Sequence, residues 1–195
     1  MASRTSHHLA PVALLALLGA TANALAQDTP WLPEARSVAS AVPPKLLTVL
    51  SEQIAQGGMA SAVAVCNEKA PQMAKTASEQ TGWAIRRVSL KNRNPKAVPD
   101  AWERETLEEF DRRAAAGEDI GKLEKFATVE VDGRPQQRYM KALPTQQLCL
   151  SCHGSRDAIP ADVAAKLHAL YPNDQATGYA LGQVRGALTI RKPAP

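Results

Sequence analysis

Two cysteines and a histidine near the end of the chain form the strongest chemical signal in the sequence. Cys149 and Cys152 are three positions apart, and His153 follows directly. Thiols at this spacing can add to the two vinyl groups of one haem, and the adjacent imidazole then reaches the iron from the same side. The motif therefore predicts one covalent haem c, with His153 as an iron ligand.

Two other kinds of site also use a cysteine pair at this spacing. A thioredoxin-like redox pair needs a βαβ context, which the residues around Cys149 do not indicate. A closed zinc site needs four ligands, and Cys66 and His168, which could complete it, lie far away in the sequence. A haem-free zinc or thiol protein therefore stays as the alternative from another class.

The second axial ligand of the iron is not decided by these residues alone. Cys66 is the third of three cysteines, so it has no disulfide partner in the chain once the other two carry haem. His168 and the methionines have simple alternative roles, on a helix surface and in the core. The candidates are Cys66, His168, Met59, Met73 and Met140, or no protein ligand at all.

The first 26 residues have the layout of a secretory signal peptide. Arg4 precedes an apolar run over 9–20, and Ala24-Leu25-Ala26 forms a small-x-small cleavage site before Gln27. The run is too short to span a bilayer comfortably, and no later stretch is apolar enough. We expect a periplasmic protein that has no membrane segment after cleavage.

Basic residues cluster where a predicted strand ends. Arg86, Arg87, Lys91 and Arg93 lie close together in the sequence, and guanidinium groups bind carboxylates well. Arg86, Arg87 and Arg93 are therefore candidate contacts for haem propionates, although a solvated loop would have the same composition.

The composition excludes several other functions. The formal net charge is +4, and aromatic residues, at 4%, are not interleaved with the basic ones, so no nucleic-acid surface is expected. No Ser/His/Asp set, phosphate loop or catalytic carboxylate pair is visible, so we do not expect an enzyme. The larger aromatic residues could line a haem or simply fill the core; they are Trp83, Trp102 and Tyr139.

The elements that would position this motif follow a helices-then-sheet order. Residues 27–44, rich in Pro, Ser and Ala, are expected to be a lead-in to a single domain over 45–195. A kink or restart is expected near Pro71. The order predicts an α+β fold with an antiparallel sheet. Helices are predicted over 45–56, 59–77, 100–117 and 160–170, with a break at Gly57-Gly58, and strands over 83–90, 126–131, 137–143 and 186–191, with a hairpin turn at Asp132-Gly133.

Over roughly Leu46 to Ile190 the chain resembles a family of c-type haem proteins with a PAS-like fold, whose domain also occurs outside the membrane in some sensor kinases. Four blocks carry the resemblance. They are Ala64-Val65-Cys66-Asn67 with Ala70-Pro71; Arg86 to Glu103, with Ser89-Leu90-Lys91 and Arg93-Asn94-Pro95; Cys149 to Gly154; and Thr177-Gly178-Tyr179 through Arg185-Gly186-Ala187.

The resemblance implies a PAS-like α+β fold in which N-terminal helices pack on an antiparallel sheet and the haem-binding segment lies near the C-terminus. It also implies that Cys66 is the second axial ligand. Ala97 departs from the family pattern, which often has Asn there. Such a His/Cys pair predicts a redox or gas sensor in which reduction, NO or CO displaces Cys66; a plain periplasmic electron carrier is the alternative. The redox partner or sensor-kinase partner is not identified by the sequence.

Overall fold

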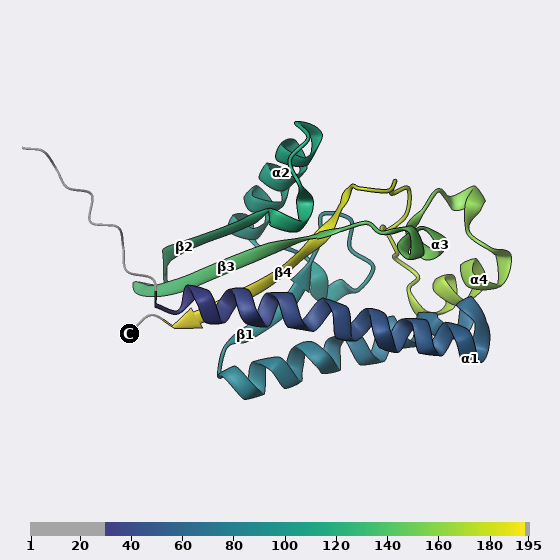
Figure 1. Ribbon diagram of the computed structural model, residues 1–195, viewed down its shortest axis with the longest axis horizontal. Helices are drawn as coiled ribbons and strands as arrows, with labels where there is room; N and C mark the ends of the chain where they lie inside the picture. Colours follow the sequence, from purple (N-terminus) through teal and green to yellow (C-terminus); the bar gives the residue numbers. More distant parts are fainter. Residues whose placement is uncertain (1–29, 194–195) are drawn as a thin grey trace, which may run out of the picture.

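A four-stranded antiparallel sheet forms the centre of the computed structural model, which describes residues 30–193 (Figure 1). The expected signal peptide, residues 1–26, lies outside the described residues. The strand order is β1-β4-β3-β2, so the last strand lies between the first and the third. The strands are β1 (Ala84–Val88), β2 (Glu124–Val131), β3 (Arg134–Pro144) and β4 (Val184–Pro193).

The first element, α1 (Leu32–Thr81), is a helical hairpin whose two arms run side by side (Figure 1). Its backbone leaves helical geometry at Gly58, where φ is 76° and ψ is 178°. Glycine reaches this region without a steric penalty, so the predicted break at Gly57-Gly58 is confirmed. The dihedral angles stay helical through Pro71, so the helix does not restart after Cys66.

The helix begins at Leu32, well before the predicted start at residue 45. Pro33 lies in the first turn, where a missing N–H leaves no hydrogen bond unmade. Ala35 and Ala39, one turn apart, are buried against the sheet. The expectation of a lead-in segment is therefore wrong for residues 32–44. The small side chains of this segment pack against the sheet, which its composition alone did not indicate.

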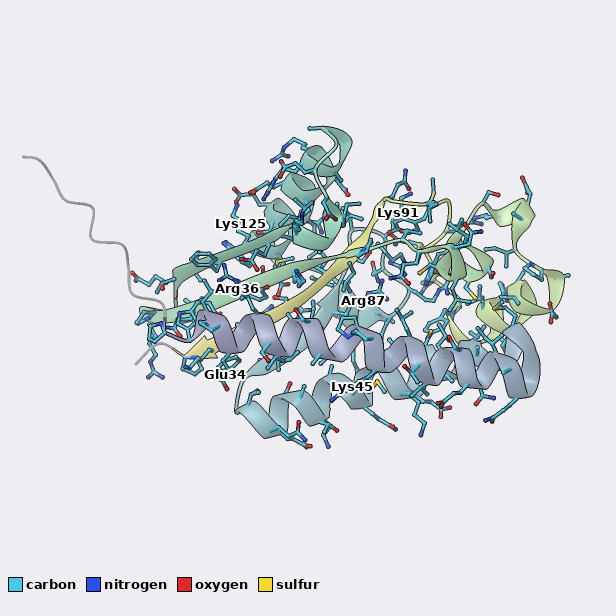
Figure 2. The ribbon with its side chains drawn as sticks, in the orientation of Figure 1. Glu34, Arg36, Lys45, Arg87, Lys91 and Lys125 are labelled. Atoms are coloured by element: carbon cyan, nitrogen blue, oxygen red, sulfur yellow. The ribbon has the colours of Figure 1, made fainter. Side chains whose placement is uncertain are left out.

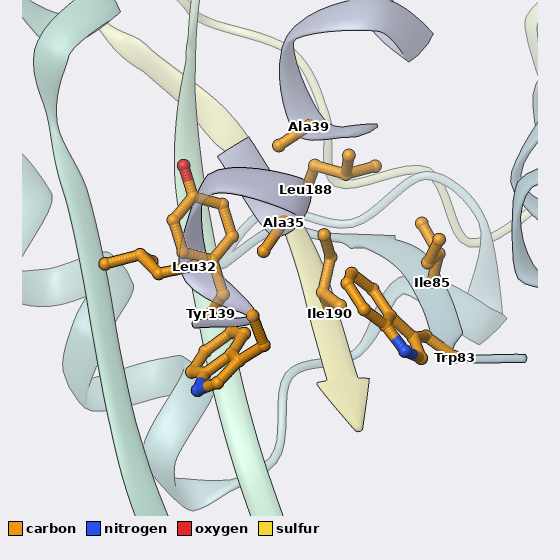
Figure 3. Close-up of a cluster of buried hydrophobic side chains, with 9 residues drawn as sticks. Leu32, Ala35, Ala39, Trp83, Ile85, Tyr139, Leu188 and Ile190 are labelled. Atoms are coloured by element: carbon orange, nitrogen blue, oxygen red, sulfur yellow. The ribbon is translucent and has the colours of Figure 1, made fainter. Parts of the chain in front are cut away.

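The hairpin covers one face of the sheet and α2 (Ala101–Ala115) covers the other. Figure 3 shows the hairpin face, where the first turns of α1 meet aromatic and aliphatic side chains of the strands. Trp83 and Tyr139 belong to this core, and Trp102 packs at the edge of the core under α2, in agreement with their expected packing role. The side chains that the sheet side contributes to the hairpin face are Trp83, which directly precedes β1, and the strand residues Ile85, Tyr139, Leu188 and Ile190.

A third cluster joins the start of the second α1 arm to α4 (Ala161–Leu170). Val63 of α1 packs with Val163 and Leu167 of α4, and Cys152 lies against this cluster. This packing places α3 (Leu150–His153), the short helix that carries the thiol and imidazole residues, beside the hairpin (Figure 1). Among residues 30–193, no helix is both long and apolar enough to span a bilayer.

Candidate functional site

The Cys149–His153 motif lies just past the end of β3, in one turn of 3-10 helix followed by α3. All three cysteines of the chain, Cys66, Cys149 and Cys152, are half-buried free thiols. Gly154 ends α3, and a Cβ there would stand 2.6 Å from the Leu150 carbonyl oxygen. The chain can therefore turn away tightly after His153 only with glycine at position 154.

The imidazole of His153 is held in one orientation through Nδ1. Nδ1 lies 2.7 Å from the carbonyl oxygen of Ala176, and because a carbonyl only accepts, Nδ1 carries the proton. Nε2 is then the unprotonated nitrogen, whose lone pair can bind a metal or accept a hydrogen bond. Burial, with repulsion from Arg185 and Arg93, lowers the pKa of His153 far below its ordinary value. The ring is therefore neutral, which is the form that binds metals.

Cys66, on the second arm of α1, lies in the same region as the motif. Burial raises the pKa of its thiol, while Arg87, Arg93 and Arg185 act in the opposite direction because their positive charges are close. Cys149 is also near enough to act on it electrostatically. The fold thus brings together a thiol, a thiol pair and a neutral imidazole that come from distant parts of the sequence.

Two arginines of this region, the buried Arg185 and the half-buried Arg87, have no carboxylate partner among the described residues. Arg185 is 5% exposed, its Nη2 lies 3.5 Å from His153 Nε2, and its Nη1 donates to Ser89 Oγ. Within the part of the chain that the structure describes, Arg87 donates only to the Arg185 carbonyl oxygen, and Nε of both arginines is buried with no hydrogen-bond partner. Burial lowers the pKa of Arg185 to about 9, so it stays charged at neutral pH. Neither forms an ion pair within residues 30–193, so an anionic group is expected beside them.

A bulge in β4 directs Arg185 toward the site. Leu143 pairs with Gly186 and Pro144 with Val184, so Arg185 is an extra residue on its strand. Gly186 has φ of 140°, and a Cβ there would stand 2.3 Å from the Val88 carbonyl oxygen. Only glycine fits beside β1 at this point, which explains the Arg185-Gly186 pair in the sequence.

The structure corrects the set of predicted propionate contacts. Arg86 points to the α2 face of the sheet, where it binds Glu103 and the carbonyl oxygens of Lys96 and Val98. Successive strand residues face opposite sides of the sheet. Arg87 therefore points to the side of the sheet where Arg185 and His153 lie, and Arg86 points away from it. Arg93 also lies near His153, but it already forms an ion pair with Asp174.

The other candidate iron ligands have different surroundings. His168 is exposed on α4, and Met140 is buried in the core under α2. Met59 packs against the α1–α4 cluster, and Met73 lines a groove between the arms of the hairpin. Residues 30–193 contain no group of three or more His, Cys, Asp and Glu side chains arranged to hold a metal ion, so the zinc alternative has no ligand set there.

An apolar stripe on the first arm of α1 is less buried than its pattern predicts. Its four members are half-buried, and none belongs to the three core clusters. Surface of this kind can accept a bulky apolar group. The four residues are Leu46, Leu47, Leu50 and Ile54.

Comparison with known proteins identifies the family. A family model described as Tll0287-like matches residues 4–193. The chain belongs to the Tll0287-like family. The crystal structure of the cyanobacterial heme-protein Tll0287 is 25% identical, with a TM-score of 0.66, and the match covers 86% of this chain and 98% of that one. No curated protein matches the chain significantly. The resemblance to a family of haem proteins is confirmed by these matches.

All four sequence blocks that carry the Tll0287-like resemblance meet at this site. Cys66, Arg93, the motif and the segment from Thr177 to Arg185 lie around His153. Sequence reasoning assigned no role to Arg185, Ser89, Asp174 or Ala176. Arg185 could have been noticed, because it precedes Gly186 in one of the four blocks that carry the family resemblance. The carbonyl group of Ala176 could not, because every residue has a backbone carbonyl.

Proposed function

We propose that this protein binds one c-type haem through thioether bonds from Cys149 and Cys152, with His153 Nε2 and Cys66 as the two axial ligands. The observation that carries the proposal is the neutral imidazole, tied through Nδ1, that presents Nε2 in the region shared by all three thiols. A bound haem would supply a redox-active iron that can also take a small gas ligand.

The charges of the site support this proposal. Arg87, Arg93 and Arg185 gather there, and only Arg93 has a carboxylate partner, Asp174, among the described residues. The guanidinium groups of Arg87 and Arg185 therefore lack an anionic partner among residues 30–193, and a haem carries two propionates. Arg87 and Arg185 are the residues that would hold them, because guanidinium binds carboxylate strongly. Figure 2 shows Arg87 beside α1, the helix that carries Cys66.

The apolar stripe on the first arm of α1 agrees with the same proposal. The half-buried stripe of Leu46, Leu47, Leu50 and Ile54 is surface that a porphyrin could cover. We extend the proposal to the fold, which we take as a PAS-like sheet with the Cys149–His153 segment added at one end.

For its biological role, we propose an exported periplasmic protein that senses redox state or a gas such as NO or CO and is not an enzyme. Cys66 lies on a helical arm that runs without a backbone break to Thr81 and leads directly into β1, which carries Arg87. Release of Cys66 from the iron would free this arm, and a redox partner or sensor kinase could detect its movement. Export rests on the signal-peptide pattern of residues 1–26.

Carbon monoxide distinguishes this function from plain electron transfer. We expect the reduced protein to bind CO, with a shifted Soret band, because a thiol ligand on a helical arm can leave the ferrous iron. The measurement is the absorption spectrum of the dithionite-reduced protein with and without CO. An unchanged Soret band would instead indicate a carrier with fixed six-coordination.

A further inference from the structure

Residues 174–179, between α4 and β4, form a strap that contacts the haem motif at three points. The amide N–H of Tyr179 donates to the His153 carbonyl oxygen at 2.9 Å, and that of Gly178 donates to the Gly154 carbonyl oxygen at 2.7 Å. The Ala176 carbonyl oxygen accepts from His153 Nδ1. The position of the strap therefore sets the orientation of the imidazole.

Asp174 anchors the start of the strap. Its Oδ2 accepts from Arg93 Nε at 2.9 Å, and its Oδ1 accepts from the amide N–H of Ala176 at 2.8 Å. A backbone bond from Gln175 N–H to the Asn92 carbonyl oxygen joins the strap to the same loop that carries Arg93. One carboxylate thus fixes both Arg93 and the peptide unit next to the one that His153 contacts.

Arg93 joins the strap to the motif directly. Its Nη2 donates to the Cys152 carbonyl oxygen at 2.6 Å and to the Ala176 carbonyl oxygen at 3.4 Å. The side chains of Arg93 and Asp174 are 7% and 13% exposed, so solvent screens this ion pair little. The planar guanidinium reaches three acceptors on two segments, which the point charge of a lysine could not do with the same geometry.

We propose that Arg93 and Asp174 are positioning residues that set the orientation and donor strength of His153. A metal-bound histidine is oriented and made more basic by the hydrogen bond that its other nitrogen donates. Here that bond ends on Ala176, whose peptide groups Arg93 and Asp174 hold. This inference rests on the proposed haem ligation, and it moves Arg93 from the propionate contacts to the support of the iron ligand.

The test compares Arg93→Lys, Asp174→Asn and the control Asp157→Asn in the haem-loaded protein. Arg93→Lys keeps the positive charge at this position but loses the planar guanidinium, whose N–H groups reach three acceptors. Asp157 is an exposed carboxylate just after the motif, with no ion pair among the described residues. For each protein the intact mass, the ferric EPR spectrum, the reduction potential and the thermal unfolding midpoint are measured.

We expect Arg93→Lys and Asp174→Asn to shift the EPR g values and to raise the reduction potential, because a less basic His153 stabilises ferric iron less. Asp157→Asn should leave both unchanged. If Asp174→Asn does not fold, Arg93→Lys alone decides.

Unchanged g values and potential in a folded, haem-loaded Arg93→Lys would overturn the positioning role and leave the proposed ligation intact. A wild-type protein without covalent haem would overturn both proposals, so the two failures can be told apart.

Discussion

Replacing Cys66 with alanine is expected to leave the haem covalently attached and to remove the sulfur ligand from the iron. The thioether bonds depend on Cys149 and Cys152, and Cys66 lies on a different element. The EPR signals of thiolate-ligated low-spin ferric iron should disappear. The potential should rise by a sizeable part of the roughly 0.8 V range that axial ligands span, because thiolate favours ferric iron.

Met59→Leu is the matched control for this variant. Met59 lies on the same arm of α1 and was itself a candidate ligand, but it packs with α4 side chains. We expect its replacement to leave the visible and EPR spectra unchanged. Loss of the sixth ligand in Met59→Leu but not in Cys66→Ala would show that sulfur ligation comes from the methionine.

Replacing Glu103 with alanine should lower the free energy of unfolding by about 3–5 kcal/mol, as expected when one partner of a buried ionic network is removed. The Glu103 side chain is fully buried and also closes the capping box of α2. Without it, Asp100 is the one anionic partner left to the buried guanidinium of Arg138 among residues 30–193. The donors to the Glu103 carboxylate are Arg86, Arg138, Arg191, Thr189 and the Asp100 backbone.

Urea unfolding of Glu103→Ala beside Glu118→Ala measures this contribution. Glu118 pairs with Arg113 on the surface at the end of α2, where ion pairs contribute little to stability. The control should therefore unfold close to the wild type. Equal losses in the two variants would mean that burial of the network around Glu103 has no stabilising role.

Much of the fold could be predicted because its signals are local. The hairpin turn at Asp132-Gly133, the start of α2 after Asp100 and the break at Gly58 all depend on residues within one turn of themselves. The start of α1 could not be predicted in this way. Ala35 and Ala39 favour burial only because β1, β3 and β4, distant in the sequence, present apolar side chains to them.

The candidate site shows the same division. Cys149, Cys152 and His153 were evident because their chemistry depends on spacing alone. Arg86 was misplaced because strand alternation, which separates it from Arg87, requires the exact position of β1. Arg185 was missed because a bulge in β4 directs it toward His153. Asp174 was missed because it reaches the site by pairing with Arg93, which lies on a distant loop, and neither feature has a pattern in the sequence.

The most direct test of the haem proposal is the intact mass of the secreted protein, purified from a host that matures c-type cytochromes. We predict a red protein whose mass equals the processed chain plus one haem, and a Cys149→Ala/Cys152→Ala variant at the mass of the processed chain alone. A colourless wild-type protein at that bare mass would contradict the account.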